Sequence, residues 1–365
     1  MTVSAFSGYC GGGVPSFPVT ALAPEDLHNG IVVRMPNWLG DAVMALPALY
    51  QLRSLLPEHG ALGVITPASL TAFYQAMPWV DVILPLASPH RMWRSDERWM
   101  VRRSAFGAGV LFNHSLRDAL MMRLCRIPRL YGAAARGRSL LLTRHFDFPE
   151  RRNTWNHAPF PARYLSMVQA LGAPAWDGRM PEIIPGPGSE LPDAWRAVAD
   201  SPRLLVLGAG ASYGAAKRWG SGSYHEVARQ WIAAGGVAAM VGSPSEAGIG
   251  AEIGTGLPED AYFNLAGKTT LPQLMRLLKQ AKAAVANDSG VMHLAAALGC
   301  PGVAVYGPTD HTSTAPIGAH WRILTAQADC APCFKRVCPR GDAVCMKAVT
   351  AADVVTALEE LLSES

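Results

Sequence analysis

Polar residues that could bind a charged ligand follow an apolar run in the second half of the chain. Residues 287–293 read Asn-Asp-Ser-Gly-Val-Met-His, and an Ala- and Leu-rich stretch comes next. This order predicts a strand, a polar turn and a helix, and ligands bind at the carboxyl ends of parallel strands. Asp288 and Ser289 can cap the helix, while Gly290 lets an anion reach the free backbone N–H groups. His293 lies about one turn further on, so the segment predicts a site for the phosphates and sugar of a nucleotide-activated donor.

A second polar loop, near the start of the chain, places a carboxylate in a similar position. Residues 34–41 read Arg-Met-Pro-Asn-Trp-Leu-Gly-Asp, after a predicted strand at 31–34 and before a predicted helix from about 41 to 56. Asp41 could cap this helix or act as a base at the carboxyl end of the sheet, and the loop alone leaves both open. Gly40 would let a ligand approach the backbone closely.

Residues 208–219 form a third loop, rich in glycine and alanine, after a predicted strand at 204–207. The loop is not a Walker A motif, because Ala216 stands at the second glycine position, and it departs from G-x-G-x-x-G at Tyr213. Its backbone N–H groups and Lys217 could still hold a diphosphate, or Lys217 could belong to a basic pair on the surface. Two such loops after predicted strands favour phosphate binding.

Four of the seven cysteines lie close together. Cys330, Cys333, Cys338 and Cys345 give the spacing C-x2-C-x4-C-x6-C. Thiols this near one another are typical of zinc or iron–sulfur sites, although the spacing differs from that of a zinc ribbon. The alternative is a surface loop whose thiols stay reduced.

The composition is that of a folded protein with one basic segment. Of the 365 residues, 50% are hydrophobic and 16% are charged, enough for two domains with substantial cores. Between Arg91 and Arg152, fourteen arginines and no lysines stand against five acids, although the whole chain has a net charge of only +4. Pure arginine usage favours recognition of phosphate or carboxylate over an ordinary solvated face. The partner could be nucleic acid, an anionic membrane or a phosphorylated substrate, but no nucleic-acid-binding motif accompanies the segment.

Apolar runs alternate with helical patterns, which predicts an α/β protein with parallel sheets. Further strands are predicted near 63–66, 82–86, 109–113, 237–241 and 283–286 and from 302, and further helices near 224–234 and 351–363. We expect a poorly ordered N-terminal extension at 1–29, a first domain at 30–172, a proline-rich hinge at 173–193, a second domain at 194–350 and a C-terminal helix at 351–365. Two such domains predict a substrate cleft between them. The first thirty residues lack the pattern of a secretory signal, and no apolar run reaches the ~20 residues that span a bilayer, so we expect a cytoplasmic protein.

Together these motifs resemble the ADP-heptose:lipopolysaccharide heptosyltransferases, the inverting GT-B enzymes of glycosyltransferase family 9, most closely the heptosyltransferase II branch. The resemblance covers roughly residues 31–362. It rests on residues 35–49, on Gly-Ala-Ala-Lys-Arg-Trp at 214–219 and on the block 287–308. The run Asn-His-Ser with Arg117, at 113–117, is similar to a polar loop on the family's acceptor side. Where the family often has Gly-Pro-Ala-Lys, this chain has Gly-Ala-Ala-Lys.

The resemblance implies a GT-B fold, in which two Rossmann-like parallel-sheet domains face each other across a cleft. It also implies transfer of heptose from ADP-L-glycero-D-manno-heptose to the inner core of lipopolysaccharide, with inversion. Asp41 would deprotonate the acceptor hydroxyl. The other implied roles are diphosphate binding by Lys217, Ser289, Gly290 and His293, sugar binding by Asp288, ribose binding by Glu246, and acceptor binding by Asn113, Ser115 and Arg117. Catalysis would need no cofactor, and a structural metal would remain possible at the four cysteines.

The implied partners are ADP-heptose and a phosphorylated lipid A-core acceptor, with transient contact with the anionic inner membrane and no nucleic acid. This would place the protein at the cytoplasmic face of the inner membrane as a peripheral protein. Two alternatives stay open: a GT-B transferase for another nucleotide sugar, and a non-catalytic protein that binds nucleotide sugars or metal.

Overall fold

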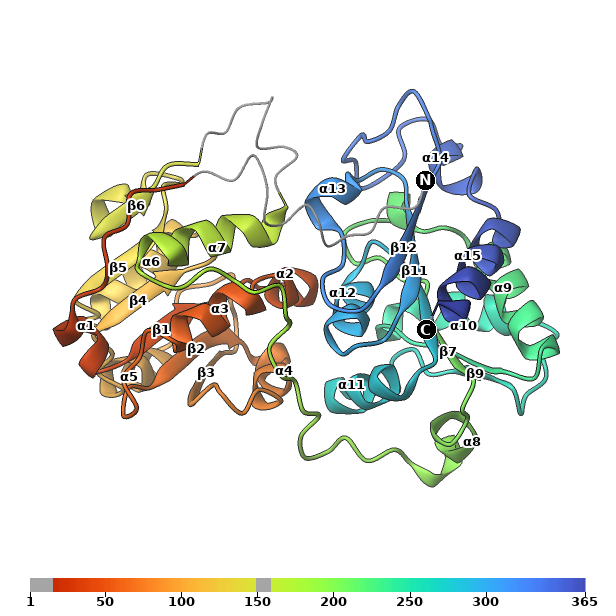
Figure 1. Ribbon diagram of the computed structural model, residues 1–365, viewed down its shortest axis with the longest axis horizontal. Helices are drawn as coiled ribbons and strands as arrows, with labels where there is room; N and C mark the ends of the chain where they lie inside the picture. Colours follow the sequence, from red (N-terminus) through yellow and green to blue (C-terminus); the bar gives the residue numbers. More distant parts are fainter. Residues whose placement is uncertain (1–15, 149–158, 365) are drawn as a thin grey trace. The chain divides into compact units, whose positions relative to one another are not determined.

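Two parallel sheets organise the protein. The computed structural model describes residues 16–148 and 159–364, and the chain divides into two compact units between Ile184 and Pro185. Each unit contains one six-stranded sheet, and every strand pairing in both sheets is parallel (Figure 1). The predicted α/β class with two Rossmann-like parallel sheets is confirmed.

The first sheet has the strand order β3-β2-β1-β4-β5-β6. Its strands are β1 (Ile31–Arg34), β2 (Leu62–Pro67), β3 (Val82–Leu86), β4 (Ala108–Leu111), β5 (Arg129–Ala133) and β6 (Arg144–Phe146). Strand β1 pairs with both β2 and β4, so the chain leaves β1 towards one edge of the sheet and returns at β4 to build the other. Ligands of doubly wound folds bind at the carboxyl ends of two such strands.

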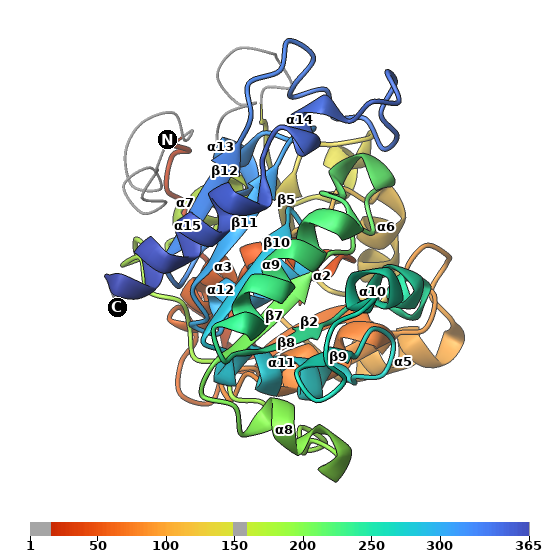
Figure 2. The ribbon, with the colours of Figure 1, turned by 90° about the vertical axis from the view of Figure 1, so that its right-hand side faces the viewer.

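Helices cover both faces of this first sheet. They are α1 (Pro24–His28), α2 (Leu39–Met44), α3 (Leu46–Arg53), α4 (Thr71–Gln75), α5 (Ser95–Arg103), α6 (Leu116–Leu124) and α7 (Phe160–Ala170), with short 3-10 turns η1 (Ala68–Leu70) and η2 (Arg138–Leu141). Helices α3 and α7 lie on one face of the sheet, and α5 and α6 lie on the other (Figures 1 and 2).

The second sheet repeats the arrangement with the order β9-β8-β7-β10-β11-β12. Its strands are β7 (Leu204–Gly208), β8 (Val237–Met240), β9 (Tyr262–Asn264), β10 (Ala283–Asn287), β11 (Gly302–Tyr306) and β12 (Trp321–Thr325). Strand β7 pairs with β8 and β10 and therefore takes the place that β1 has in the first sheet.

Helices also cover the second sheet, with α9, α10 and α15 on one face and α11 and α12 on the other (Figure 2). The helices of this unit are α8 (Arg196–Ala199), α9 (Ser221–Ala233), α10 (Ala247–Gly254), α11 (Leu271–Gln280), α12 (Gly290–Ala297), α13 (His311–Thr314), α14 (Val344–Lys347) and α15 (Ala351–Ser363), with turns η3 (Asp193–Trp195), η4 (Ala215–Lys217) and η5 (Pro244–Glu246). Within the described ranges, none of the helices is both long and apolar enough to cross a bilayer.

The structure differs from the sequence expectations in three places. The helix expected at 41–56 is two helices, α2 and α3, because Pro47 lies in the first turn of α3 and cannot donate a backbone hydrogen bond. Strands β5, β6, β9 and β12 had not been predicted. Residues 16–29 of the expected extension are attached to the first unit: the Thr20 and Leu22 N–H groups donate to the carbonyls of Ala170 and Leu171. Residues 1–15 of that extension lie outside the described residues.

Glycine at the start of β11 is required by close packing. A Cβ at Gly302 would lie 2.4 Å from the Ala284 carbonyl oxygen and 2.7 Å from the Trp321 ring. We expect Gly302→Ala to lower the free energy of unfolding by about 1–3 kcal/mol, because a backbone atom cannot move aside cheaply. Gly222→Ala is the matched control, since nothing lies within 4 Å of its added Cβ in α9 and alanine favours helix. Urea denaturation measures both, and equal stability of the two variants would contradict the prediction.

Candidate functional site

A buried amide joins the two loops that follow β7 and β10. The Asn287 side chain, at the end of β10, is fully buried. Its Nδ2 donates to the carbonyls of Ala209 (2.8 Å) and Gly210 (3.3 Å), and its Oδ1 accepts from the Trp219 N–H (3.2 Å) and the Tyr224 hydroxyl (3.0 Å). The two ends of the loop 208–219 are thereby fixed beside the first turn of α12.

The same loop places Lys217 against Asp288. Lys217 Nζ lies 2.5 Å from Asp288 Oδ2, and both side chains are largely buried. Asp288 Oδ2 also accepts from the Thr309 hydroxyl at 2.7 Å, in the loop after β11. Three successive loops of one sheet edge therefore meet at a single carboxylate. A cation held this way suits binding of a diphosphate, and a carboxylate suits sugar hydroxyls.

His293 and Ser289 bring further polar atoms to the same edge. His293 Nε2 lies 3.9 Å from Asp288 Oδ1, and burial lowers the pKa of His293 to about 4, so the imidazole is neutral at pH 7. Ser289 precedes α12, but its side chain makes no capping hydrogen bond. Among the described residues, Ser289 Oγ and His293 Nδ1 are buried without a hydrogen-bond partner. Gly290 begins α12, whose first N–H groups have no partner within the helix. These groups are available to an anion.

Glu246 lies on the other side of β7 from Lys217, in the turn after β8. Its Oε2 accepts from the Ser243 N–H at 2.7 Å, and its carboxylate is buried. A Cβ at Gly210 would lie 2.0 Å from Glu246 Oε1, and one at Gly242 would lie 2.5 Å from Oε2. Two glycines therefore make room for this carboxylate at the sheet edge, next to the loop that holds Lys217.

The cysteine-rich segment packs on the Lys217 loop. The Ala216 N–H donates to the Arg336 carbonyl at 3.1 Å, and the Tyr213 hydroxyl donates to the Phe334 carbonyl at 3.0 Å. Two cations contact the Tyr213 ring: Lys217 Nζ lies 4.9 Å from the ring centre, and the Arg336 guanidinium lies 5.1 Å from it. Segment 330–345 thus supports the position of Lys217, which its cysteine spacing had not indicated.

The structure does not support the structural metal that the spacing of the four cysteines left possible. Over residues 16–148 and 159–364, no group of three or more His, Cys, Asp or Glu side chains is arranged to hold a metal ion. The thiols have different environments: Cys345 packs in the hydrophobic core, where burial raises its pKa. Cys338 lies 3.9 Å from Asp342 Oδ1, and backbone N–H groups lower its pKa. Cys330 and Cys333 are free and half-buried.

In the first unit, the predicted acceptor residues surround a buried carboxylate, Asp118. Its Oδ2 accepts from Arg34 Nε (2.9 Å) and Asn113 Nδ2 (2.6 Å), and its Oδ1 accepts from Arg117 Nε (3.1 Å) and Trp93 Nε1 (3.2 Å). Ser115 caps α6 by accepting from the Asp118 N–H. Three predicted residues, Asn113, Ser115 and Arg117, are therefore brought together, and each also holds Asp118 in place.

Asp41 lies at the same edge of the first sheet, one strand away. It is in the first turn of α2, and the N-cap position belongs to Trp38. The position of Asp41 is thus not that of the helix cap that the loop sequence left open. Its negative charge, together with the larger effect of burial, raises the pKa of Tyr164 in α7.

Several residues of these sites had not been singled out from the sequence. Arg34 is fully buried although it is charged, and its position at the end of the apolar strand β1 was an available signal. Thr309 follows β11 as Asp288 follows β10, so its position after an apolar strand was a signal of the same kind. Tyr213 and Arg336 offered no signal, because their contact joins positions more than a hundred residues apart.

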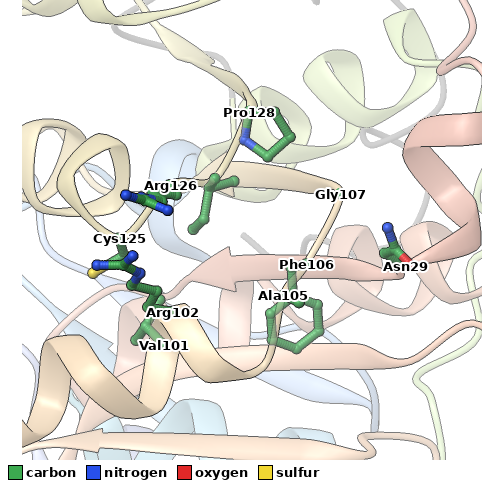
Figure 3. Close-up of a pocket in the computed structure, with 10 residues that line it drawn as sticks. Asn29, Val101, Arg102, Ala105, Phe106, Gly107, Cys125, Arg126 and Pro128 are labelled. Carbon is green, nitrogen blue, oxygen red and sulfur yellow. The ribbon is translucent and has the colours of Figure 1, made fainter.

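A pocket of about 360 Å³ lies at the opposite edge of the first sheet. It is near the start of β4 and the ends of α5 and α6, with Asn29, Arg102, Phe106, Cys125, Arg126 and Pro128 among its lining residues (Figure 3). Since ligands of such sheets bind at the carboxyl edge, this pocket is separate from the candidate site.

Residues 98–343 match the family model described as glycosyltransferase family 9 (heptosyltransferase). The chain is 29% identical over 310 residues to the lipopolysaccharide heptosyltransferase 2 of Salmonella typhimurium, covering 80% of this chain and 87% of that protein. It is 24% identical to a lipooligosaccharide heptosyltransferase 2 of Campylobacter jejuni, covering 92% and 99%. The solved structure of the ADP-heptose lps heptosyltransferase II of E. coli superposes with a TM-score of 0.75 at 25% identity, covering 92% of this chain and 99% of that one.

The low pKa of His293 should make the fold sensitive to acid. Because this pKa is about 4 in the folded protein and 6.5 in the unfolded chain, the folded state binds fewer protons between these values. The contribution of His293 to the free energy of unfolding is therefore fully present above pH 6.5 and falls as the pH drops towards 4. When the pH is lowered from 7 to 4.5, we expect the free energy of unfolding to fall by about 2 kcal/mol less for His293→Gln than for the wild type. Urea unfolding at the two pH values measures this difference. The exposed His90→Gln is the control, and a loss for His293→Gln as large as that of the wild type would count against the assignment.

Proposed function

The chain belongs to glycosyltransferase family 9, the heptosyltransferases, and we propose that it moves a heptose from ADP-heptose to the inner core of lipopolysaccharide with inversion at the anomeric carbon. Membership of the family confirms the resemblance seen in the motifs, and the protein is a glycosyltransferase. The observation that carries the proposed chemistry is the meeting of Lys217, Asp288 and His293 at the edge where β7 and β10 end.

The second unit is proposed to bind the donor. Lys217 would neutralise charge on the diphosphate as it leaves, together with the backbone N–H groups at Ser289 and Gly290 and the dipole of α12. His293 is neutral at pH 7, so its orphaned Nδ1 could accept or donate a hydrogen bond according to its tautomer. Asp288 would accept hydrogen bonds from sugar hydroxyls. Glu246 would bind the adenosine ribose, a role supported by its position beside Gly210.

The first unit is proposed to bind the acceptor and to supply the base. Asp41 would take the proton of the attacking hydroxyl while its oxygen bonds to the anomeric carbon. The bond from that carbon to the diphosphate oxygen breaks, and ADP leaves with the electron pair. Asn113, Ser115 and Arg117 would bind the acceptor with the polar atoms not engaged by Asp118. These charged groups act without a metal ion in the proposed step.

The proposed acceptor is lipid-anchored and phosphorylated, which implies work at the cytoplasmic face of the inner membrane. The arginine-rich segment of the first unit supports this, since anionic lipids attract clustered basic residues. We also assign the proline-rich segment 173–193, in which the two units divide, as the hinge between the acceptor-binding and donor-binding domains.

Incubation with nucleotide sugars and truncated core acceptors tests the proposed function. The expected result is a product heavier than the acceptor by one heptose, formed from ADP-heptose and detected by mass spectrometry. UDP- and GDP-linked sugars serve as competitors, because the fold alone also suits other nucleotide sugars. Transfer from one of these sugars, with none from ADP-heptose, would refute the donor assignment.

Removal of the proposed base should stop turnover and leave donor binding intact. Asp41→Asn keeps the shape of the side chain and loses its basicity, so we expect kcat to fall about 10²–10⁴-fold. The dissociation constant for ADP-heptose, measured by calorimetry, should change less than threefold. Asp260→Asn, an exposed change near the amino end of β9, is the matched control. Normal turnover by Asp41→Asn would eliminate Asp41 as the base.

A further inference from the structure

One face of the first unit exposes large apolar side chains in a row. Leu116, Leu120 and Leu124 are spaced by four residues and lie along one side of α6, and Leu124 is 55% exposed. Trp99 on α5 is 57% exposed, and Leu140 on η2 is 97% exposed. Helices α5 and α6 cover the same face of the sheet (Figures 1 and 2), and η2 contacts α6. These side chains therefore belong to one outward surface, the leucine–arginine face.

Arginines border the apolar residues of this face. Arg98, Arg102 and Arg103 are exposed on α5, and the Arg103 guanidinium lies 4.9 Å from the centre of the Trp99 ring. Arg126 follows α6 and is also exposed. Figure 3 shows the guanidinium groups of Arg102 and Arg126 on the same side of the pocket between the two helices. The surface thus presents several cations that could meet phosphate groups together.

Few carboxylates offset these arginines. Of the acids between residues 91 and 148, Glu97 and Asp118 are buried and used inside the unit. Asp96 is exposed and pairs with Arg94, and Asp147 is exposed and lies beside His145. The leucine–arginine face is therefore positively charged as well as apolar.

This combination fits the surface of an anionic bilayer better than other partners. Leucine and tryptophan can enter the boundary between headgroups and acyl chains, while arginines bind lipid phosphates. A symmetric second copy would bring the same arginines together, at a cost in repulsion. A nucleic acid would engage the arginines but would leave the leucines of α6 and Leu140 in water.

The position of the face also agrees with the proposed function. Helix α6 begins directly after Ser115, so Leu116 lies within the segment 113–117, whose polar residues are proposed to bind the acceptor. An acceptor anchored in the same bilayer would present its sugars at that end of the helix. The row of leucines runs from there towards the amino edge of the sheet.

We propose that the leucine–arginine face docks the protein on anionic phospholipid. This inference rests on the proposed function and deepens it, because it names the surface that contacts the membrane in which the acceptor is anchored. Two variants test it: Arg98→Gln/Arg102→Gln/Arg103→Gln removes three charges, and Leu120→Ser/Leu124→Ser removes two exposed leucines. The control Arg196→Gln/Arg229→Gln/Arg276→Gln removes three exposed arginines of the second unit.

Co-sedimentation with vesicles of phosphatidylglycerol and phosphatidylethanolamine, free of acceptor, measures the binding. We expect the arginine variant to reduce partitioning by roughly a hundredfold and the leucine variant by roughly tenfold, with little effect of the control. Phosphatidylcholine vesicles should bind the wild type weakly. Wild-type partitioning by either variant overturns the proposal. The proposal is also overturned if the variants lose self-association, measured by light scattering, and not vesicle binding. Binding of single-stranded RNA by the wild type as strongly as it binds the anionic vesicles would overturn it as well.

Turnover on a soluble, lipid-free acceptor separates this inference from the proposed function. Both variants should keep wild-type turnover there, since none of their residues belongs to the proposed donor or acceptor sites. Absence of transfer by the wild type would refute the proposed function while leaving vesicle binding as an independent result. Vesicle binding that is unchanged in the variants would refute only the docking face.

Discussion

The second unit depends on one buried side-chain amide. Asn287 uses both donors and its acceptor oxygen inside the fold, and its partners come from the two ends of the loop that contains Lys217. An aspartate there could not donate to the carbonyls of Ala209 and Gly210, and an apolar residue would remove the hydrogen bonds of those carbonyls and of the Trp219 N–H with residue 287. Asn287 thereby ties the loop that contains Lys217 to the end of β10, next to Asp288 and α12. The chemistry of the edge therefore has a rigid support within the same sheet.

In the first unit, a buried ion pair holds the loops at the sheet edge in place. There, Asp118 takes hydrogen bonds from Arg34, Asn113, Arg117 and Trp93, and the Arg34–Asp118 pair is fully buried. A buried charge is tolerable only when its partner and its hydrogen bonds are all present, so loss of any one of these groups affects the others. Residues proposed to bind the acceptor are consequently also structural. Substitutions at Asn113 or Arg117 will alter stability as well as recognition, and only a comparison of the two effects separates them.

The sequence predicted local features well and long-range ones poorly. The strands β1, β2, β3, β4, β7, β8, β10 and β11 are apolar runs bounded by glycine or polar residues, so their positions could be read directly. Strand β5 has the sequence Arg-Leu-Tyr-Gly-Ala and β9 has only the three residues Tyr-Phe-Asn, so neither is a clear apolar run. The polar loops after β1, β7 and β10 were found for the same reason as the strands that precede them. By contrast, the contact of Tyr213 with Arg336 and the role of Asp118 depend on packing between distant segments, which no spacing in one sequence reveals.

The short contact between Lys217 and Asp288 has a consequence for what happens after transfer. In the structure each charge neutralises the other. A diphosphate that takes the lysine leaves the carboxylate without its cation, and a buried unpaired charge is unfavourable. An intact donor offers the hydroxyl groups of its heptose to Asp288 as compensation, whereas the departing ADP has lost the heptose and keeps only the ribose, which is assigned to Glu246. Under the proposed function, ADP should thus bind more weakly than ADP-heptose, and product inhibition by ADP should be weak. Equal dissociation constants for ADP and ADP-heptose would contradict this.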